Sequence, residues 1–312
     1  MIKVDLITGF LGSGKTTFLK KYARHFMNQG LRVGILENDY GAVNVDMLLL
    51  NELRGENCEL EMVAGGADFD THKRRFKTKL IAMAMSGYDR VIIEPSGIFD
   101  VDEFFDTLRD EPLDKWYEIG NVIAIVDAAL EENLSESDDY YLASQIANAG
   151  MIILSKTNLT DQAHIDSTLS HIERACQMAK LKKDVRKIAF IKDWDRLENK
   201  DYEQIANASF AMSSYVKKIS QDDNSYKTLY FMELGLKKAA IKELVSSLMT
   251  DESFGNVLRI KGFFNEDDKW YQLNATKSVS DISQIAVGQE VFIVIGDHLN
   301  ESLIKDYISR LQ

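Results

Sequence analysis

Glycine, lysine and threonine residues near the N-terminus have the types and the spacing that bind phosphate. The segment Gly9–Thr16, GFLGSGKT, matches the pattern G-x-x-x-x-G-K-[ST]. Its glycines let the backbone turn tightly and bring N–H groups against phosphate oxygens. Lys15 would reach the β- and γ-phosphates of a nucleotide, and the Thr16 hydroxyl would hold Mg²⁺. Because an apolar strand pattern precedes the loop and an amphipathic helix pattern follows it, residues 3–20 predict a P-loop.

Acidic residues follow two further strand patterns. Asp39 comes just after residues 32–37, RVGILE, and Glu94 ends the buried pattern at 91–93. In parallel sheets the strand ends deliver ligands to a bound nucleotide. We therefore expect the Glu94 carboxylate to face Mg²⁺ or the attacking water, and the Gly97 N–H can approach a γ-phosphate. For Asp39 two interpretations stay open, a ligand of Mg²⁺ and a solvated turn.

A third candidate site follows the strand pattern at 151–155. The residues Ser155-Lys156-Thr157-Asn158 resemble a degenerate form of the N-K-x-D element that reads guanine. Lys156 would pack along the base plane. Asn158 stands where an aspartate accepts two hydrogen bonds from guanine, and an amide cannot supply that charge-assisted pair. We expect a loss of guanine discrimination of roughly 1–3 kcal/mol.

The elements that must position these residues alternate between strand and helix. Strand patterns at 3–9, 32–37, 91–93, 121–127, 151–155 and 186–191 alternate with helical patterns such as 71–86 and 161–181. This order predicts an α/β fold with a doubly wound, mostly parallel sheet over residues 1–215. Residues 225–312 instead give strands in succession, at 226–234, 256–263, 269–274 and 290–296, with helices at 236–249 and 299–311. They predict a smaller α+β domain, with 218–225 as the linker.

Composition narrows the functional class. The net charge of −12 and the sequence pI of about 5.0 argue against nucleic acid or an anionic membrane as a partner. No apolar run approaches the roughly 18 residues of a membrane span. The chain has two cysteines, Cys58 and Cys176, which make no disulfide framework. We therefore expect a cytoplasmic protein.

Taken together, the motifs resemble those of the CobW-type P-loop GTPases, relatives of the GTPases that insert nickel into urease and hydrogenase. The resemblance rests on GFLGSGKTT, ENDYGAVNVD, IIEPSG and SKTN, and on a C-terminal stretch, VLRIKGFFNEDDKWYQL, that is similar to the CobW C-terminal domain. It covers nearly the whole chain. It implies a slow GTPase that uses GTP and Mg²⁺ and acts as a switch in metal or metallocofactor delivery to a client protein, or in that client's maturation.

The resemblance also assigns roles to individual positions. Lys15, Glu94 and Gly97 would act in catalysis, and Thr16, Asp39 and Glu94 would hold Mg²⁺. The nucleotide-binding positions would be Gly12, Ser13, Gly14, Lys15, Thr16, Thr17, Ser155, Lys156 and Asn158. The family's C-x-C-C metal motif is absent, since Ala67-Asp68-Phe69-Asp70 stand at the matching positions. Asp68, Asp70 and His72 could offer harder ligands to a second divalent metal, or could simply be solvated.

Two other functions remain open at this point. The chain could be a nucleotide-binding adaptor with little hydrolysis and no metal carriage. It could also be an NTPase with a relaxed choice between GTP and ATP, because Ser155 and Asn158 depart from the guanine-reading element.

Overall fold

The computed structural model describes residues 1–10, 12–39, 45–64, 69–95, 101–131, 134–213, 226–232, 234–277, 280–285, 288 and 290–312. The chain divides into two compact units, Met1–Lys218 and Ile219–Gln312. The predicted linker, 218–225, lies outside the described residues, so the predicted boundary between domains at 215 and 225 stays a prediction. Each unit is described here by itself.

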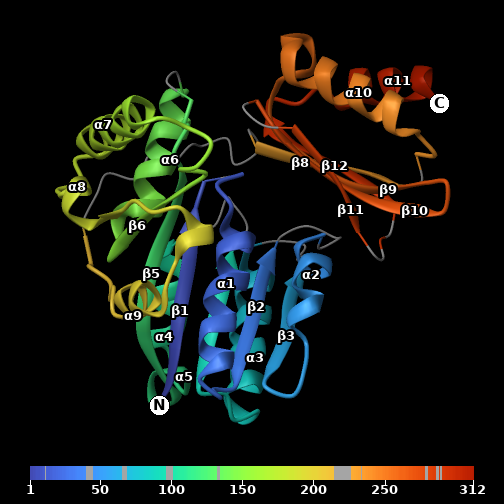
Figure 1. The fold of residues 1–312 in the computed structure, drawn as a ribbon. Coiled ribbons are helices and arrows are strands. Elements are labelled where there is room, and N and C mark those ends of the chain that lie inside the picture. The colour runs from blue at the N-terminus through green and yellow to red at the C-terminus, as the bar shows by residue number, and fades with distance from the viewer. Residues whose placement is uncertain are drawn as a thin grey trace. The chain divides into compact units, whose positions relative to one another are not determined.

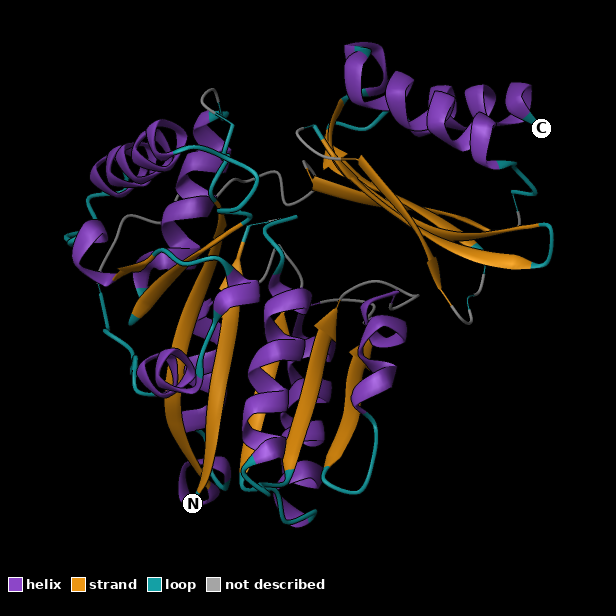
Figure 2. Ribbon diagram, viewed as in Figure 1, coloured by secondary structure: helices purple, strands orange, loops and turns teal. Residues whose placement is uncertain are grey.

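The first unit contains a seven-stranded parallel sheet with helices on both faces (Figures 1 and 2). Its strands are β1 (Ile2–Gly9), β2 (Val33–Asp39), β3 (Cys58–Ala64), β4 (Arg90–Pro95), β5 (Tyr117–Asp127), β6 (Met151–Ser155) and β7 (Ala189–Phe190). They lie in the order β3-β2-β4-β1-β5-β6-β7, and the pairings among the described residues are all parallel. The predicted doubly wound sheet is confirmed.

Nine helices of the described residues belong to this unit. They are α1 (Lys15–Asn28), α2 (Val45–Leu50), α3 (Phe69–Met85), α4 (Val101–Arg109), α5 (Leu113–Trp116), α6 (Glu136–Ala147), α7 (Gln162–Met178), α8 (Val185–Ile188) and α9 (Asn199–Ala206). Strand side chains alternate between two cores because successive residues of a strand point to opposite faces. Val122 and Ala124 pack with α3 to α7 on one face, whereas Ile123 and Ile125 pack with α1 and α9 on the other.

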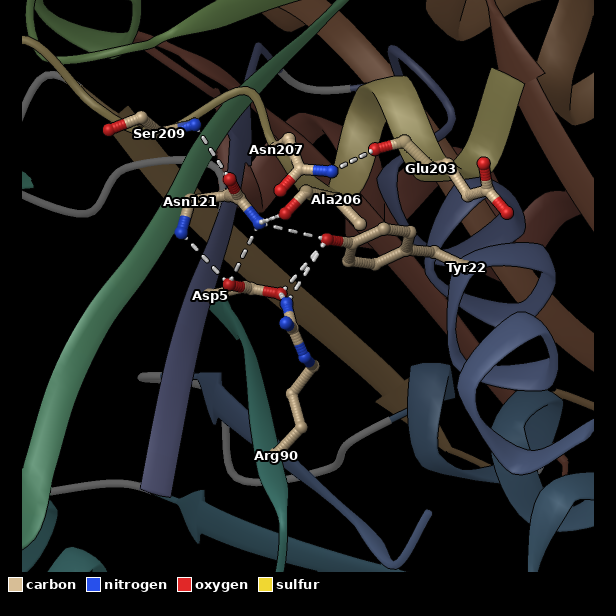
Figure 3. A network of polar contacts seen from close by, with 8 residues as sticks. All are labelled: Asp5, Tyr22, Arg90, Asn121, Glu203, Ala206, Asn207 and Ser209. Atoms are coloured by element: carbon tan, nitrogen blue, oxygen red, sulfur yellow. Dashed lines mark hydrogen bonds and ion pairs between the residues drawn. The ribbon is translucent and has the colours of Figure 1, made fainter. Parts of the chain in front are cut away.

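A buried polar network ties β1, β4, β5 and α1 together in the interior (Figure 3). The Asp5 carboxylate accepts hydrogen bonds from Arg90, from the Tyr22 hydroxyl at 3.0 Å and from the Asn121 backbone N–H at 2.8 Å. The Asn121 side chain also bonds the Ala206 carbonyl and the Ser209 N–H. The network therefore joins the strand before the glycine loop to the helix after it.

The second unit pairs a five-stranded antiparallel sheet with two helices. Its elements are β8 (Tyr226–Met232), α10 (Lys238–Thr250), β9 (Asn256–Glu266), β10 (Lys269–Thr276), β11 (Ser280–Ile285), β12 (Val291–Asp297) and α11 (Glu301–Leu311). The helices bury Ile241, Leu244 and Ile304 against the sheet. The antiparallel α+β architecture matches the sequence pattern.

Three details differ from the sequence patterns. The strand expected at 186–191 is the short helix α8 followed by the two-residue β7. The edge strand β11 carries mostly exposed polar residues, so no apolar alternation predicted it. The strand expected at 121–127 begins earlier, at Tyr117. The sequence pattern missed its first residues because they are more polar than the buried centre of the strand.

Candidate functional site

The glycine loop joins β1 to α1 with the backbone geometry that its sequence predicts. Gly12 has φ 75° and Gly14 has φ 94°, values that side-chain-bearing residues rarely adopt. The Ser13 N–H donates to the Phe10 carbonyl at 3.3 Å, which closes the turn. Gly14 then caps α1 in the left-handed conformation, so the helix begins at Lys15 with its N-terminal N–H groups at the loop.

Lys15 is buried, with its ammonium folded back over the start of the loop. Its Nζ donates to the Gly9 carbonyl at 3.1 Å and to the Phe10 carbonyl at 3.3 Å. A buried ammonium needs such partners because desolvation penalises an unpaired charge. The charge therefore lies against the backbone of the loop, where an anion's oxygens could take over these bonds.

Thr16 and Glu94 meet beside the loop. The Thr16 hydroxyl donates to Glu94 Oε1 at 2.9 Å, and both side chains are buried. Glu94 comes from the carboxyl end of β4, and β4 pairs directly with β1. Two hard oxygen donors predicted from motifs 78 residues apart thus lie next to each other. The neighbouring Thr17 is exposed on the other side of the helix turn.

A second carboxylate that sequence reasoning missed lies on the neighbouring strand. Glu37 in β2 is the register partner of Glu94 in β4, and it is buried as well. The next residue, Asn38, is joined by a hydrogen bond of 2.7 Å to Nε2 of the fully buried His72 in α3. Glu37 and Glu94 each stand at the end of an apolar strand pattern in the sequence, and this common position could have identified Glu37.

Several predicted positions cannot be placed. Gly97 and Asp68 lie outside the described residues, as do the side chains of Asp39 and Asp70. The backbone of Asp39 ends β2 beside Ala64. Among the residues that the structure describes, no three His, Cys, Asp or Glu side chains gather into a metal-binding group. The second metal site at Asp68, Asp70 and His72 stays a prediction.

The predicted base-reading loop follows β6 on the other side of β1. Ser155 is buried and its hydroxyl donates to the Val126 carbonyl at 3.3 Å, whereas Asn158 is exposed. Lys156 has φ 55°, a strained backbone conformation for a lysine. Its ammonium forms an ion pair with Asp127 at the end of β5. This pair ties the lysine to the end of the neighbouring strand β5.

Helix α6 supplies a further contact that local sequence patterns did not predict. The Gln145 amide oxygen accepts from the Thr8 hydroxyl and, at 3.4 Å, from the Gly9 N–H. Gly9 has φ 139°, and a Cβ there would collide with the Ile125 carbonyl. The start of the loop is thus held by its own glycine and by a side chain 136 residues away.

The described cysteines offer no accessible thiolate. Cys58 packs in the core on the α1 face and Cys176 in the core on the opposite face, so the sheet separates them. Burial raises the pKa of each thiol from 9.0 to about 11. Both groups are therefore protonated at neutral pH and poor ligands for soft metals.

Comparison with known proteins decides the family. Residues 3–185 match the model of the CobW/HypB/UreG nucleotide-binding domain. This chain belongs to that family. The match covers the glycine loop, Glu94 and the 155–158 loop, and it confirms the relationship that the sequence motifs indicated.

Curated relatives include the zinc chaperone YjiA of Escherichia coli, 30% identical over 52% of this chain and 51% of YjiA. They also include the zinc-regulated GTPase metalloprotein activator 1 of Schizosaccharomyces pombe, 23% identical over 99% of this chain and 84% of that protein. Among solved structures, zinc-bound YjiA GTPase from E. coli is 18% identical, covers 100% of this chain and 99% of its own, and has a TM-score of 0.37. The chain spans about half the length of the E. coli relatives in these sequence matches.

Among the described residues, no helix is both long enough and apolar enough to cross a bilayer.

Proposed function

We propose that this protein is a GTP-hydrolysing switch of the CobW type that assists metal or metallocofactor delivery to a client protein, or that client's maturation. The proposal depends above all on one observation: Lys15, Thr16 and Glu94 converge at one edge of the sheet, within a chain of the CobW/HypB/UreG family. Its relatives include a zinc chaperone and a zinc-regulated GTPase metalloprotein activator, and both support the same function.

The donor set fits a magnesium ion. Mg²⁺ prefers hard oxygen ligands and is bound in nucleotide sites by one or two protein groups together with phosphate oxygens. The Thr16 hydroxyl and the Glu94 carboxylate are such ligands, and they lie 2.9 Å apart. When bound, the ion would neutralise phosphate charge, and Asp39 is a further candidate ligand.

The chain's own residues would do the remaining work. The backbone amides of residues 12–17 and the N-terminus of α1 would hold the phosphates. Lys15 would exchange its carbonyl partners for β- and γ-phosphate oxygens. Glu94 would orient the attacking water, and the Gly97 N–H would contact the γ-phosphate. Hydrolysis would then change the conformation of the segments 38–46 and 94–100, which follow β2 and β4.

GTP is the nucleotide that the 155–158 loop favours. Lys156 forms an ion pair with Asp127, its stem would pack on a base, and Asn158 is exposed two residues further along the chain. An amide in place of a carboxylate weakens recognition of guanine, and we therefore expect a modest preference for GTP over ATP.

The client step would proceed without thiolate ligands from the described residues, because both cysteines are buried and protonated. A cargo metal would need the harder ligands Asp68, Asp70 and His72, and the described partner of His72 Nε2 is Asn38. We propose that the second unit presents the nucleotide-dependent change to a client metalloprotein or cofactor enzyme. We infer a cytoplasmic location, in keeping with two cysteines that the sheet keeps apart.

The proposal is tested by single-turnover hydrolysis of Mg-GTP. Wild-type protein should hydrolyse the bound nucleotide, and Lys15→Ala should lower the rate by about a hundredfold or more, the typical effect of removing one donor that stabilises charge developing in the transition state. Lys20→Ala is the matched control, because Lys20 lies five residues further along α1 and pairs with Glu52. Turnover that survives Lys15→Ala would refute the assignment. GTP that stays intact for hours on wild-type protein would identify a non-hydrolysing adaptor instead.

A further inference from the structure

A short 3₁₀ turn after β7, Trp194–Arg196, contacts both loops of the nucleotide site. The indole Nε1–H of Trp194 donates to the Leu154 carbonyl at 3.0 Å. Leu154 immediately precedes Ser155, so this bond fixes the backbone from which the 155–158 loop departs. No motif pointed to Trp194, because the turn belongs to none of the recognised patterns.

The same indole lies against the glycine loop. A Cβ at Gly14 would lie 3.4 Å from the far edge of the Trp194 ring and 3.6 Å from the Ser155 Cβ. The ring also packs on Phe18 in the first turn of α1, with centroids 5.5 Å apart and planes tilted by 60°. One side chain thus contacts the end of the glycine loop, the start of α1 and the strand end that leads to the base-reading loop.

Further contacts hold the turn in place. The Asp195 carboxylate forms an ion pair of 2.9 Å with Lys21 of α1. Asp193 caps the turn, because its carboxylate accepts from the Asp195 N–H at 3.0 Å. The indole is therefore anchored through its ring, through its N–H and through the turn that carries it.

We propose that Trp194 is a positioning residue that fixes the base-reading loop relative to the phosphate-binding loop. The inference rests on the proposed function, since it needs a ligand that spans both loops. A nucleoside di- or triphosphate engages Gly14 and Lys15 at one end and Lys156 and Asn158 at the other. Holding the two loops at a fixed separation removes an ordering cost from binding. A ligand with phosphates alone gains nothing from this bridge.

The ligand comparison separates positioning from simple packing. Trp194→Ala removes the ring and the N–H, whereas Trp194→Phe keeps most of the ring contact with Gly14 and Phe18 but loses the bond to Leu154. Affinities would be measured by calorimetry with Mg²⁺ for GDP and for inorganic tripolyphosphate. Trp116→Phe is the control, because Trp116 ends α5 just before the amino end of β5.

We expect Trp194→Ala to weaken GDP binding at least tenfold, about 1.4 kcal/mol, and tripolyphosphate binding less than threefold. Trp194→Phe should lie between wild type and Trp194→Ala for GDP, and it carries the test if the alanine variant fails to fold. Equal losses for both ligands, or no loss for GDP, would overturn the inference while leaving the nucleotide site intact. Wild-type protein that binds neither ligand would instead refute the proposed function.

Discussion

Replacing Arg90 by methionine tests how strongly the buried network of Figure 3 stabilises the first unit. The Arg90 guanidinium pairs with the fully buried Asp5, and it also lies 4.1 Å from the centroid of the Phe26 ring. Methionine keeps an unbranched apolar stem against Phe26 but removes the charge. The variant leaves a buried carboxylate whose remaining partners are Tyr22 and Asn121.

The expected cost follows from this burial. Removing one partner of a buried ion pair typically costs about 3–5 kcal/mol, because the other charge stays desolvated. In a unit of 218 residues, this corresponds to a fall in Tm of roughly 6–12 °C. By contrast, Arg32 precedes β2, is 45% exposed, and approaches Glu59 only to 3.9 Å. Arg32→Met should cost less than about 1 kcal/mol.

The pH dependence gives the sharper test. Burial raises the pKa of Asp5 above 3.8 and Arg90 opposes that rise, so the pKa climbs further in the variant. The folded variant then holds a proton that the unfolded chain has released. Its stability relative to wild type should therefore fall as pH rises from about 4 through the folded-state pKa. Urea unfolding of wild-type protein, Arg90→Met and Arg32→Met at pH 5 and pH 8 measures this difference in stability. An Arg90→Met variant no less stable than Arg32→Met, or equally destabilised at both pH values, would refute the reasoning.

Two further predictions follow from the site and the cores. Native Cys58 and Cys176 should react with a thiol reagent at pH 8 about a hundredfold more slowly than the unfolded chain, because raising the pKa from 9.0 to about 11 lowers the thiolate fraction by that factor. Fast labelling of either native thiol would contradict its burial. Since the thiols of the unfolded chain ionise first, the free energy of unfolding should also fall as pH rises from 9 to 11. Asn158→Asp should raise the ratio of GTP to ATP affinity by about tenfold, the equivalent of 1.4 kcal/mol from one charge-assisted acceptor; calorimetry with both nucleotides measures it, and an unchanged ratio would show that Asn158 does not read the base.

Sequence patterns predicted the sheet because each strand of its centre is a short apolar run. β4 and β6 are buried along their whole length, and each appears in the sequence as an uninterrupted apolar stretch. The edges were harder to predict, since an edge strand needs few apolar residues. β7 has two residues, and β11 has a polar sequence that pairs with β10 alone among the described strands.

His171 shows the same limit for single residues. Within the helical pattern at 161–181, His164 and His171 lie seven residues apart on one face, which predicts a pair of solvated histidines rather than a metal site. That interpretation is wrong for His171, which is buried and bonded to Asp139 at 2.6 Å, whereas His164 is exposed. The deciding neighbour lies on α6, which the spacing within α7 cannot show.

The residues of the candidate site also differ in how well the sequence predicts them: those in one local motif were identified, whereas those from distant parts of the chain were not. A phosphate-binding loop works through its own backbone, so Gly12, Gly14, Lys15 and Thr16 stand in one short motif that can be read directly. The residues that hold the loop have no such constraint: they come from whichever strand or helix packs beside it. Gln145, Asp5 and Trp194 support the loop and its flanking elements from three different parts of the chain.

A supporting residue of this kind needs only to fill a particular space and satisfy a particular polar atom. A glutamine, an aspartate and a tryptophan can each do so, and their types therefore leave no common signature in the sequence. Their positions become apparent only when the neighbouring backbone is known, as for the Leu154 carbonyl that meets the Trp194 N–H. Substitutions at Arg90 and Trp194 should thus separate two properties of the first unit: its stability, through the buried charge of Asp5, and the alignment of the two proposed nucleotide-binding loops, through the indole.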